Sequence, residues 1–360
     1  MMTRLDSGKV SDALGHVERE LAALWAPAEG EPPRSRVCTG NLVVLAGHAG
    51  RDRAVALVDA IVAADAARTF LVDVDPKMPL WGVETSVTAR CRRDGDQLLC
   101  AERIDLSLGA GAAVRGPSLL ASLAVAEVPT TVLVLAPPPP ALLGPLLREA
   151  TRLVLDSDSL GLEATRALAG ATSAQIVDLA WLRLLPWRNQ LAAAFDPPAL
   201  RPAVSAVRSL HIVTASPGGA TSALAPATRL LVGWLASRLS WKLRSPREAT
   251  DPLLHPVALE LSSRPAPGVD PGALLSVELT AQLGDAPMHV ELTRDLATPT
   301  LQINRTVEGH PALTERISLD TPSLSSLVDR ALSGQQPDAV LRQALATALP
   351  SPSSSPEQPS

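Results

Sequence analysis

Residues 37–46 read Val37-Cys-Thr-Gly-Asn-Leu-Val-Val-Leu-Ala46, an apolar and β-branched run that is typical of a buried strand. The sequence then predicts a helix over Asp52–Ala66 and a second buried strand over Thr69–Val74, which reads Thr-Phe-Leu-Val-Asp-Val. A strand, a helix and a second strand in this order form a βαβ unit, and such units normally build a parallel sheet. We therefore predict an α/β domain in the N-terminal part of the chain.

An amphipathic helix is predicted before this unit. Apolar side chains recur there at steps of four and three, on one helix face that ends near Pro27: Val10, Leu14, Val17, Leu21 and Leu24. The charged, proline-containing segment 28–35 then reads as a linker. We expect residues 1–35 to form an N-terminal helix and linker.

The next two segments, Val83–Arg92 and Gln97–Leu106, alternate apolar and polar residues. Arg93-Asp94-Gly95-Asp96 lies between them, so the pattern predicts a β-hairpin with one solvated face. A turn on Gly95-Asp96 would place Cys91 opposite Cys100, whereas a turn on Asp94-Gly95 would make them diagonal neighbours. Both registers put them on the apolar face. We consider two interpretations, a redox pair and two small buried side chains.

Helical and strand patterns continue to alternate as far as residue 195, and Pro197–Pro202 reads as a domain boundary. Beyond it, consecutive short strands dominate, and two helices are expected over Ser323–Leu332 and Pro337–Leu349. We predict an α/β domain over 36–196 with a mixed, largely parallel sheet, and an α+β domain over 197–349 with an antiparallel sheet. The Pro/Ser-rich segment 350–360 is expected to be a disordered tail.

Composition narrows the class of protein. The chain has 360 residues, of which 46% are hydrophobic, enough for two cores. Its net charge of −5 favours neither a nucleic acid nor an anionic membrane as partner. No signal peptide or transmembrane segment is expected, because charges and prolines interrupt the apolar stretches. Three cysteines, an odd number, do not suggest a disulfide framework. We therefore expect a cytoplasmic protein without a membrane partner.

Signatures of common catalytic sites are missing from the sequence. It contains no GxxxxGK[ST] phosphate loop, no HExxH motif and no GxSxG elbow. The six histidines include no close pair, which disfavours a metal site. We expect no catalytic residue, no metal and no cofactor.

One alternative is a ligand site at the strand ends. Asp73 ends a predicted strand and could bind a ribose hydroxyl, but the turn Gly47–Asp52 lacks the G-x-G-x-x-G spacing of a dinucleotide site. The glycine-containing segment Gly109–Gly116 includes Arg115 just before a predicted helix, where an anion could bind. A solvated strand end and a flexible loop are the simpler interpretations.

The segment Asp178-Leu-Ala-Trp-Leu-Arg-Leu-Leu-Pro-Trp-Arg188 is unlike ordinary core sequence. Two Trp and two Arg fall close together, and these residue types are enriched at interaction hot spots. Pro186 is predicted to begin a new helix. Trp181, Arg183, Trp187 and Arg188 are therefore candidates either for partner binding or for buried structural anchors.

This segment resembles the glucose-6-phosphate dehydrogenase assembly (OpcA) family, and other segments match in order along residues 36–320. Those segments are Cys38–Val44, Arg115–Ser118, Val128–Thr130, Arg152–Ser157 and Thr228–Leu239. The resemblance implies a non-catalytic assembly factor or allosteric activator of glucose-6-phosphate dehydrogenase, at the entry to the oxidative pentose phosphate pathway.

Arg115 joins the partner-binding candidates on this resemblance. The sequence departs from the family at Leu133–Pro140, where relatives commonly carry a Trp pair. The alternative function is a sugar-phosphate- or nucleotide-binding enzyme or sensor, with its site at the strand ends of the α/β domain.

Overall fold

The computed structural model describes residues 10–26, 34–61, 67–94, 97–216, 224–334 and 339–348. Most of the predicted linker and the predicted tail lie outside these residues. The chain divides into two compact units. The first comprises Met1–Leu160, Leu168–Leu179 and Ser323–Pro337, and the second comprises Gly161–Ala167, Ala180–Pro322 and Asp338–Ser360.

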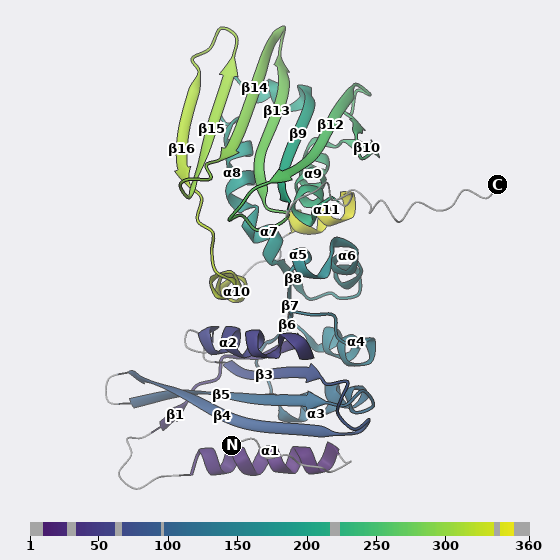
Figure 1. Cartoon of the computed structure of the whole chain (residues 1–360), viewed down its shortest axis with the longest axis vertical. Helices are drawn as coiled ribbons and strands as arrows, with labels where there is room; N and C mark the ends of the chain where they lie inside the picture. The colour runs from purple at the N-terminus through teal and green to yellow at the C-terminus, as the bar shows by residue number, and fades with distance from the viewer. Residues whose placement is uncertain are drawn as a thin grey trace, which may run out of the picture. The chain divides into compact units, whose positions relative to one another are not determined.

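The first unit contains an eight-stranded sheet in the order β1-β5-β3-β2-β6-β7-β8, with β4 paired to β5 (Figure 1). Its strands are β1 (Arg34–Arg36), β2 (Gly40–Gly47), β3 (Ala67–Val74), β4 (Val83–Asp94), β5 (Gln97–Leu108), β6 (Thr130–Val134), β7 (Arg152–Leu155) and β8 (Gln175–Asp178). All pairs are parallel except β4 with β5. The path from β5 to β8 has the strand order of the doubly wound Rossmann fold. The predicted mixed, largely parallel sheet is confirmed.

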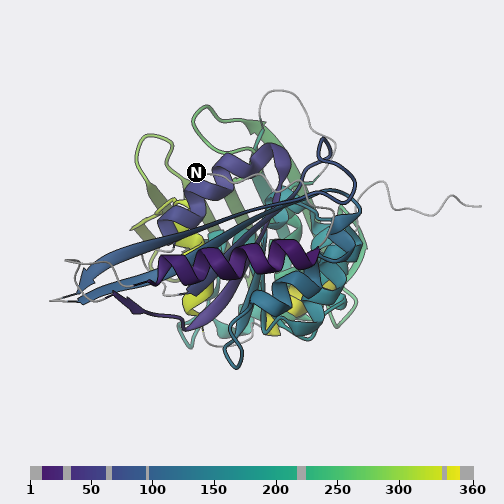
Figure 2. The same cartoon turned by 90° about the horizontal axis from the view of Figure 1, so that it is seen from below.

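Helices cover both faces of this sheet. They are α1 (Val10–Leu24), α2 (Arg51–Ile61), α3 (Gly116–Leu123), α4 (Pro140–Glu149), α5 (Ser157–Leu160) and α10 (Leu324–Ser333). Helix α6 (Leu162–Gly170) is divided between the two units. Figure 2 shows α1 in front of the sheet, whereas α2 lies on the opposite face. Ala13 and Val17 of α1 are buried in one core with side chains of β2, β3, α3 and α4. The sequence periodicity of α1 thus marks its buried face.

The hairpin has the register that a turn on residues 95–96 requires. Asp94 lies opposite Gln97, and Cys91 lies opposite Cys100. Residues 95–96 themselves lie outside the described part of the chain. Because β5 also pairs with β3 in parallel, the hairpin extends the Rossmann-type sheet at one edge.

The second unit contains another eight-stranded sheet, in the order β10-β11-β12-β9-β13-β14-β15-β16. Its strands are β9 (Val207–Ser216), β10 (Lys242–Ser245), β11 (Glu248–Thr250), β12 (Pro256–Pro265), β13 (Leu274–Leu283), β14 (Ala286–Arg294), β15 (Thr300–Val307) and β16 (Leu313–Ser318). The sheet is antiparallel except for the parallel pair β9 and β12. The α+β prediction is confirmed, although the parallel pair and strands β10 and β11 were not predicted.

Helices α7 (Leu179–Arg183), α8 (Leu185–Ala193), α9 (Pro226–Leu239) and α11 (Ala339–Thr347) accompany the second sheet. Helix α9 packs closely against α11 at Gly233. A Cβ atom there would lie 2.3 Å from the carbonyl oxygen of Ala344, so only glycine permits this approach. The Thr347 hydroxyl donates a hydrogen bond to the Gly233 carbonyl oxygen at 2.7 Å.

Candidate functional site

The Trp-Arg segment forms two short helices, because Pro186 in the first turn of α8 interrupts the helical run. Trp181 and Trp187 are only 1% and 2% exposed, so both indoles belong to the core. The Arg188 guanidinium carbon lies 3.4 Å from the centroid of the Trp181 ring, and Arg188 also donates to the Trp181 carbonyl oxygen. Arg183 is half-buried. These contacts make the segment a rigid internal element of the fold.

Asp178, the last residue of β8, begins the same segment and is fully buried. The backbone N–H of Ser157 donates to its Oδ1 atom at 3.0 Å. Burial raises the pKa of Asp178 to about 7, although the hydrogen bonds with Ser157 act in the opposite direction. This carboxyl group therefore changes its charge near neutral pH.

In a doubly wound sheet, ligands bind beyond the carboxyl ends of the strands, where the strand order reverses. Here that point lies between β2 and β6. Gly47 at the end of β2 faces Ala136 after β6, and a Cβ atom at Gly47 would come within 3.2 Å of the Ala136 Cβ. The loops at the switch point thus pack closely against each other.

Asp73 at the end of β3 has partners within the chain. Its side chain is fully buried and pairs with Arg51 at the start of α2 and with His48, whose Nδ1 lies 3.0 Å from Oδ2. The Ser107 hydroxyl donates to Asp73 at 2.8 Å and accepts from Arg51 at 2.7 Å. These side chains link the ends of β2, β3 and β5. The acidic side chain considered for ribose binding is therefore engaged in an internal ion pair.

The ionic network continues along β5. Arg51 lies 3.9 Å from Asp105, and Arg103 lies 3.0 Å from the same carboxylate. Burial raises the pKa of Asp105, although Arg103 and Arg51 partly counteract it. Arg103 also pairs with Asp59 of α2. The network therefore joins α2 to the sheet as a structural connection.

Arg115 lies beside the loop between β3 and β4. Its guanidinium carbon is 5.5 Å from the centroid of the Trp81 ring. Trp81 and Leu80 are 49% and 60% exposed, and Val114, next to Arg115, is 60% exposed. Two neighbouring loops thus present aromatic, aliphatic and cationic side chains to solvent.

The glycines before Arg115 allow this arrangement. A Cβ atom at Gly109 would lie 2.0 Å from the carbonyl oxygen of Pro79, and one at Gly111 would lie 2.9 Å from that of Leu80. The Gly111 N–H donates to the Leu80 carbonyl oxygen at 2.7 Å. These glycines therefore let one loop pack onto the other, and no anion is needed to explain them.

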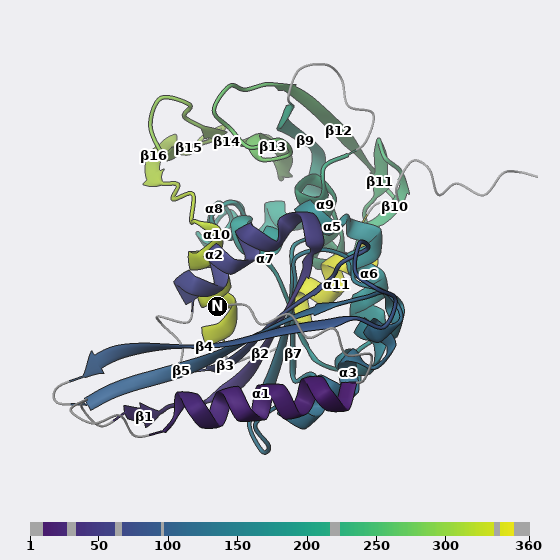
Figure 3. The ribbon, with the colours of Figure 1, turned by 60° about the horizontal axis from the view of Figure 1, so that its bottom comes forward.

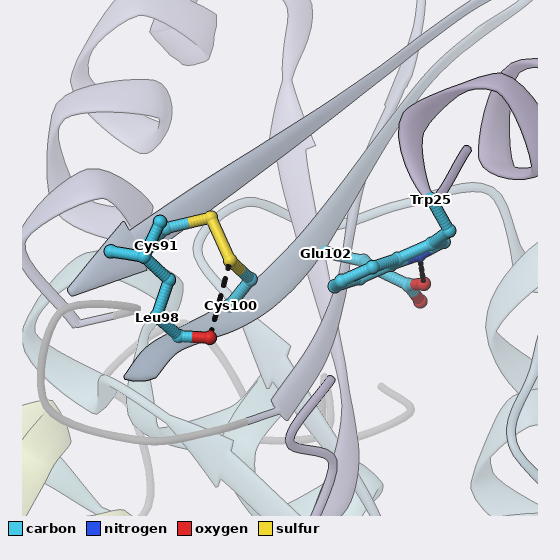
Figure 4. Close-up of a disulfide and its surroundings, with 5 residues drawn as sticks. All are labelled: Trp25, Cys91, Leu98, Cys100 and Glu102. Atoms are coloured by element: carbon cyan, nitrogen blue, oxygen red, sulfur yellow. Dashed lines mark hydrogen bonds between the residues drawn. A yellow bond between two sulfur atoms is a disulfide. The ribbon is translucent and has the colours of Figure 1, made fainter. Parts of the chain in front are cut away.

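Cys91 and Cys100 form a disulfide across the hairpin, with their Cα atoms 4.0 Å apart (Figure 4). Cys100 is buried, but Cys91 is exposed, so the interpretation of two small buried side chains is wrong for Cys91. Glu102, two residues beyond Cys100 on the same strand, accepts a 2.6 Å hydrogen bond from the Trp25 indole. The disulfide thus lies close to the connection between β5 and the end of α1.

The described residues contain no group of three or more His, Cys, Asp or Glu side chains placed to hold a metal ion. Among the same residues, no helix has both the length and the apolarity that a membrane span requires.

Sequence reasoning missed Trp81, Leu80 and Val114, and it missed Arg51 as the partner of Asp73. A Trp in the proline-containing turn 75–82 could have indicated an exposed aromatic side chain. No sequence pattern links this turn to Gly109–Gly116, because the contact depends on the packing of two loops.

Fold and site together define a two-unit α/β protein whose first unit has Rossmann strand order without the dinucleotide fingerprint. Residues 41–171 match the family described as glucose-6-phosphate dehydrogenase subunit N-terminal domain, and residues 174–345 match the corresponding C-terminal domain. The chain belongs to this OpcA family of glucose-6-phosphate dehydrogenase assembly proteins.

Curated relatives agree with this assignment. A protein of Synechocystis sp. named "Putative OxPP cycle protein OpcA" is 27% identical over 292 residues, which cover 74% of this chain and 60% of that protein. A protein of the same name from Nostoc punctiforme is 32% identical over 176 residues, covering 45% of this chain and 35% of that protein. The chain thus matches about 60% of the length of the first relative and 35% of the second, less than two thirds of each.

The similarity to solved structures is weaker. One is the structure of a mutant of KijD10, a 3-ketoreductase from Actinomadura kijaniata, in complex with TDP-benzene and NADP. It is 14% identical to this chain with a TM-score of 0.43, and the match covers 88% of this chain and 96% of the KijD10 chain. An oxidoreductase from Sinorhizobium meliloti is 13% identical with a TM-score of 0.43, covering 86% of each chain. At this sequence identity and TM-score, the similarity carries no information about activity.

Proposed function

We propose that this chain is a non-catalytic assembly factor or allosteric activator of glucose-6-phosphate dehydrogenase, acting in the cytoplasm on the oxidative pentose phosphate pathway. The observation that carries the proposal is the ordered match of both dehydrogenase-subunit families, over residues 41–171 and 174–345. Because the match extends through both compact units, the proposal concerns the chain as a whole and not one shared module.

The chemistry of the strand ends supports a non-catalytic role. Asp73 is held by Arg51, His48 and Ser107, so its carboxylate oxygens already have partners. The sequence also lacks the glycine spacing with which a Rossmann-type sheet binds pyrophosphate. A function exercised through protein contacts requires neither feature.

Activation by a binding partner requires differential affinity. If this chain binds the active conformer or oligomer of the dehydrogenase more tightly than the inactive one, mass action shifts the population toward the active form. A tenfold shift corresponds to about 1.4 kcal/mol of differential binding free energy. A few well-placed side chains supply that amount.

We assign different roles to the candidate residues within this proposal. Trp181, Arg183, Trp187 and Arg188 act as structural anchors, since both indoles are buried and Arg188 lies on Trp181. Arg115, which is exposed, is the candidate that remains accessible to a partner.

The test mixes the full chain with the glucose-6-phosphate dehydrogenase of the same organism. Co-elution in size-exclusion chromatography reports the complex, and substrate saturation curves report the change in kcat and KM. We expect a complex and a higher rate at limiting glucose 6-phosphate. The proposal is wrong if the two proteins elute separately and the saturation curve is unchanged.

A second measurement separates this proposal from the alternative of a nucleotide or sugar-phosphate site. Melting of the chain alone is followed with NADP and with glucose 6-phosphate. A saturable rise in melting temperature would support the alternative, since a ligand that binds only the folded state stabilises it. We expect no shift at millimolar ligand.

A further inference from the structure

We propose that Leu80, Trp81, Val114 and Arg115 form a docking surface that binds an acidic segment of the dehydrogenase carrying at least one apolar side chain. We call these four residues the loop patch. This inference rests on the proposed function and adds to it the surface through which the partner binds and the chemistry of the segment bound.

Exposure of apolar side chains is the first observation. Among the described residues, the large hydrophobic side chains that are exposed are Leu80, Trp81, Val114, Leu253, Leu254 and Leu296. Three of these six lie on the two adjoining loops of the loop patch. Clustered apolar exposure of this kind marks an interaction site, whereas scattered single residues do not.

The loop patch is also held in place before any partner binds. The Leu80 carbonyl oxygen accepts hydrogen bonds from Gly111 at 2.7 Å and from Ala112 at 3.0 Å. Both loops leave the same end of the sheet, because β3 and β5 are parallel and Val74 pairs with Leu108 (Figure 3). A patch fixed by its own backbone loses little conformational entropy on binding, which favours affinity.

Charge determines the chemistry of the partner. The Arg115 guanidinium and the Lys77 ammonium form no ion pair with any residue that the structure describes. Asp75, the nearest acid in the sequence, instead accepts from the Lys77 backbone N–H and lies 3.6 Å from His48 Nε2. The loop patch therefore presents one cation without an ion-pair partner, Arg115, beside apolar side chains, and Lys77 belongs to the same loop as Leu80 and Trp81, although the chain as a whole carries a charge of −5. A carboxylate-bearing segment complements it.

The residue types agree with this role. Trp and Arg are the side chains that most often dominate binding free energy at interfaces, and here they stack on each other at 5.5 Å. An apolar side chain of the partner would cover Trp81 and Leu80, and a carboxylate would pair with Arg115 in a bidentate manner. Exclusion of water by the apolar contact would strengthen that ion pair.

The experiment measures binding of the full chain to the dehydrogenase by surface plasmon resonance. We expect the double variant Leu80→Ala/Trp81→Ala to weaken the complex about thirtyfold, the loss typical of a hot-spot residue. The variant Arg115→Glu should weaken it about tenfold or more, because a like charge then faces the acidic segment. Wild-type binding should also weaken as salt rises from 50 to about 300 mM.

Two matched controls change the same chemistry elsewhere. Leu253→Ala/Leu254→Ala removes two leucines that are 74% and 67% exposed. Arg247→Glu reverses the charge of another exposed arginine. Both controls should bind within about twofold of wild type, a change too small to indicate an interface contact.

The outcomes separate this inference from the proposed function. If wild type binds and both loop-patch variants bind within about twofold of it, the loop patch is overturned while the dehydrogenase remains the partner. If wild type itself does not bind, the proposed function fails. If the loop-patch variants no longer self-associate in analytical sedimentation but still bind the dehydrogenase, the loop patch binds a second copy of this chain. The assignment of the loop patch to the dehydrogenase is then wrong. Should the double variant misfold, Arg115→Glu alone decides.

Discussion

Arg152 on β7 donates a hydrogen bond to the carbonyl oxygen of Ala331, 179 residues further along the chain, at 3.2 Å. The same guanidinium also donates to the carbonyl oxygens of Leu332 and Gly334. The last carbonyls of a helix have no partner within it, so Arg152 satisfies the C-terminal end of α10. This side chain thereby ties a late helix to the first unit, where α10 packs against α2.

Replacing Arg152 by Met should therefore release α10. We expect a loss of about 1–3 kcal/mol of unfolding free energy, because carbonyl groups that are only partly buried lose their charged hydrogen-bond donor. Hydrogen exchange of amides in Leu327–Ser333 should accelerate much more than exchange in β2. Arg152→Lys keeps the charge but lacks the planar guanidinium group with its several N–H donors, so it should recover only part of the lost unfolding free energy. Unchanged exchange in α10 would contradict the assigned role.

Trp181 should matter for stability far more than Trp81. Truncation of a fully buried Trp leaves a cavity, and we expect Trp181→Ala to lower the free energy of unfolding by about 3–5 kcal/mol. Trp81 is 49% exposed, so Trp81→Ala should cost about 1 kcal/mol or less. Urea denaturation of both variants measures the difference. Equal losses would show that Trp181 is not the structural anchor its burial indicates.

Periodicity and strand signals predicted most of the fold. The helix over residues 10–24, the βαβ unit, the hairpin and the alternating strands of the second sheet depend on local patterns, and the structure contains them. The parallel pairing of β9 with β12 was not predictable, because 39 residues separate Ser216 from Pro256 and pairing direction is decided by tertiary packing. The packing of α10 against α2 was not predictable for the same reason, because it depends on contacts between segments far apart in sequence, such as the hydrogen bond from Arg152 to Ala331.

The candidate site was less predictable than the fold. Trp181 and Trp187 have the composition of a hot spot, but sequence alone cannot tell a buried indole from an exposed one. Asp73 lies at the predicted strand end, and its pairing with Arg51 required the geometry of three neighbouring strands. Arg115 was singled out for a possible anion, whereas its ring contact with Trp81 depends on two loops that are separate in sequence.

Asp178 should make stability depend on pH near neutrality. Its pKa is about 7 in the folded chain, against 3.8 for an ordinary Asp, so between these values the folded state holds a proton that the unfolded state has lost. The stabilisation is complete below about pH 4 and is lost as pH rises through 7. We expect the unfolding free energy of wild type, relative to Asp178→Asn, to fall by on the order of 2–4 kcal/mol between pH 4.5 and 7.5. Denaturation at several pH values, with the exposed Asp285→Asn as charge control, measures it. A difference that rises with pH would contradict the assignment.

The disulfide between Cys91 and Cys100 should stabilise the hairpin and respond to reductant. The bridge closes a loop with a sequence separation of 9, and loop closure of that length stabilises by about 2–3 kcal/mol. Dithiothreitol should therefore lower the melting temperature of wild type, while Cys91→Ser/Cys100→Ser should melt at that lower temperature with and without reductant. Because Cys91 is exposed, a small reductant reaches the bridge without unfolding of the chain. Cys38→Ser is the matched control, since Cys38 is the free cysteine, and its melting should keep the wild-type response. Alkylation followed by mass spectrometry decides whether the bridge forms. If Cys91 and Cys100 are both alkylated under oxidising conditions, the disulfide does not form. A redox role for this pair would then have no basis.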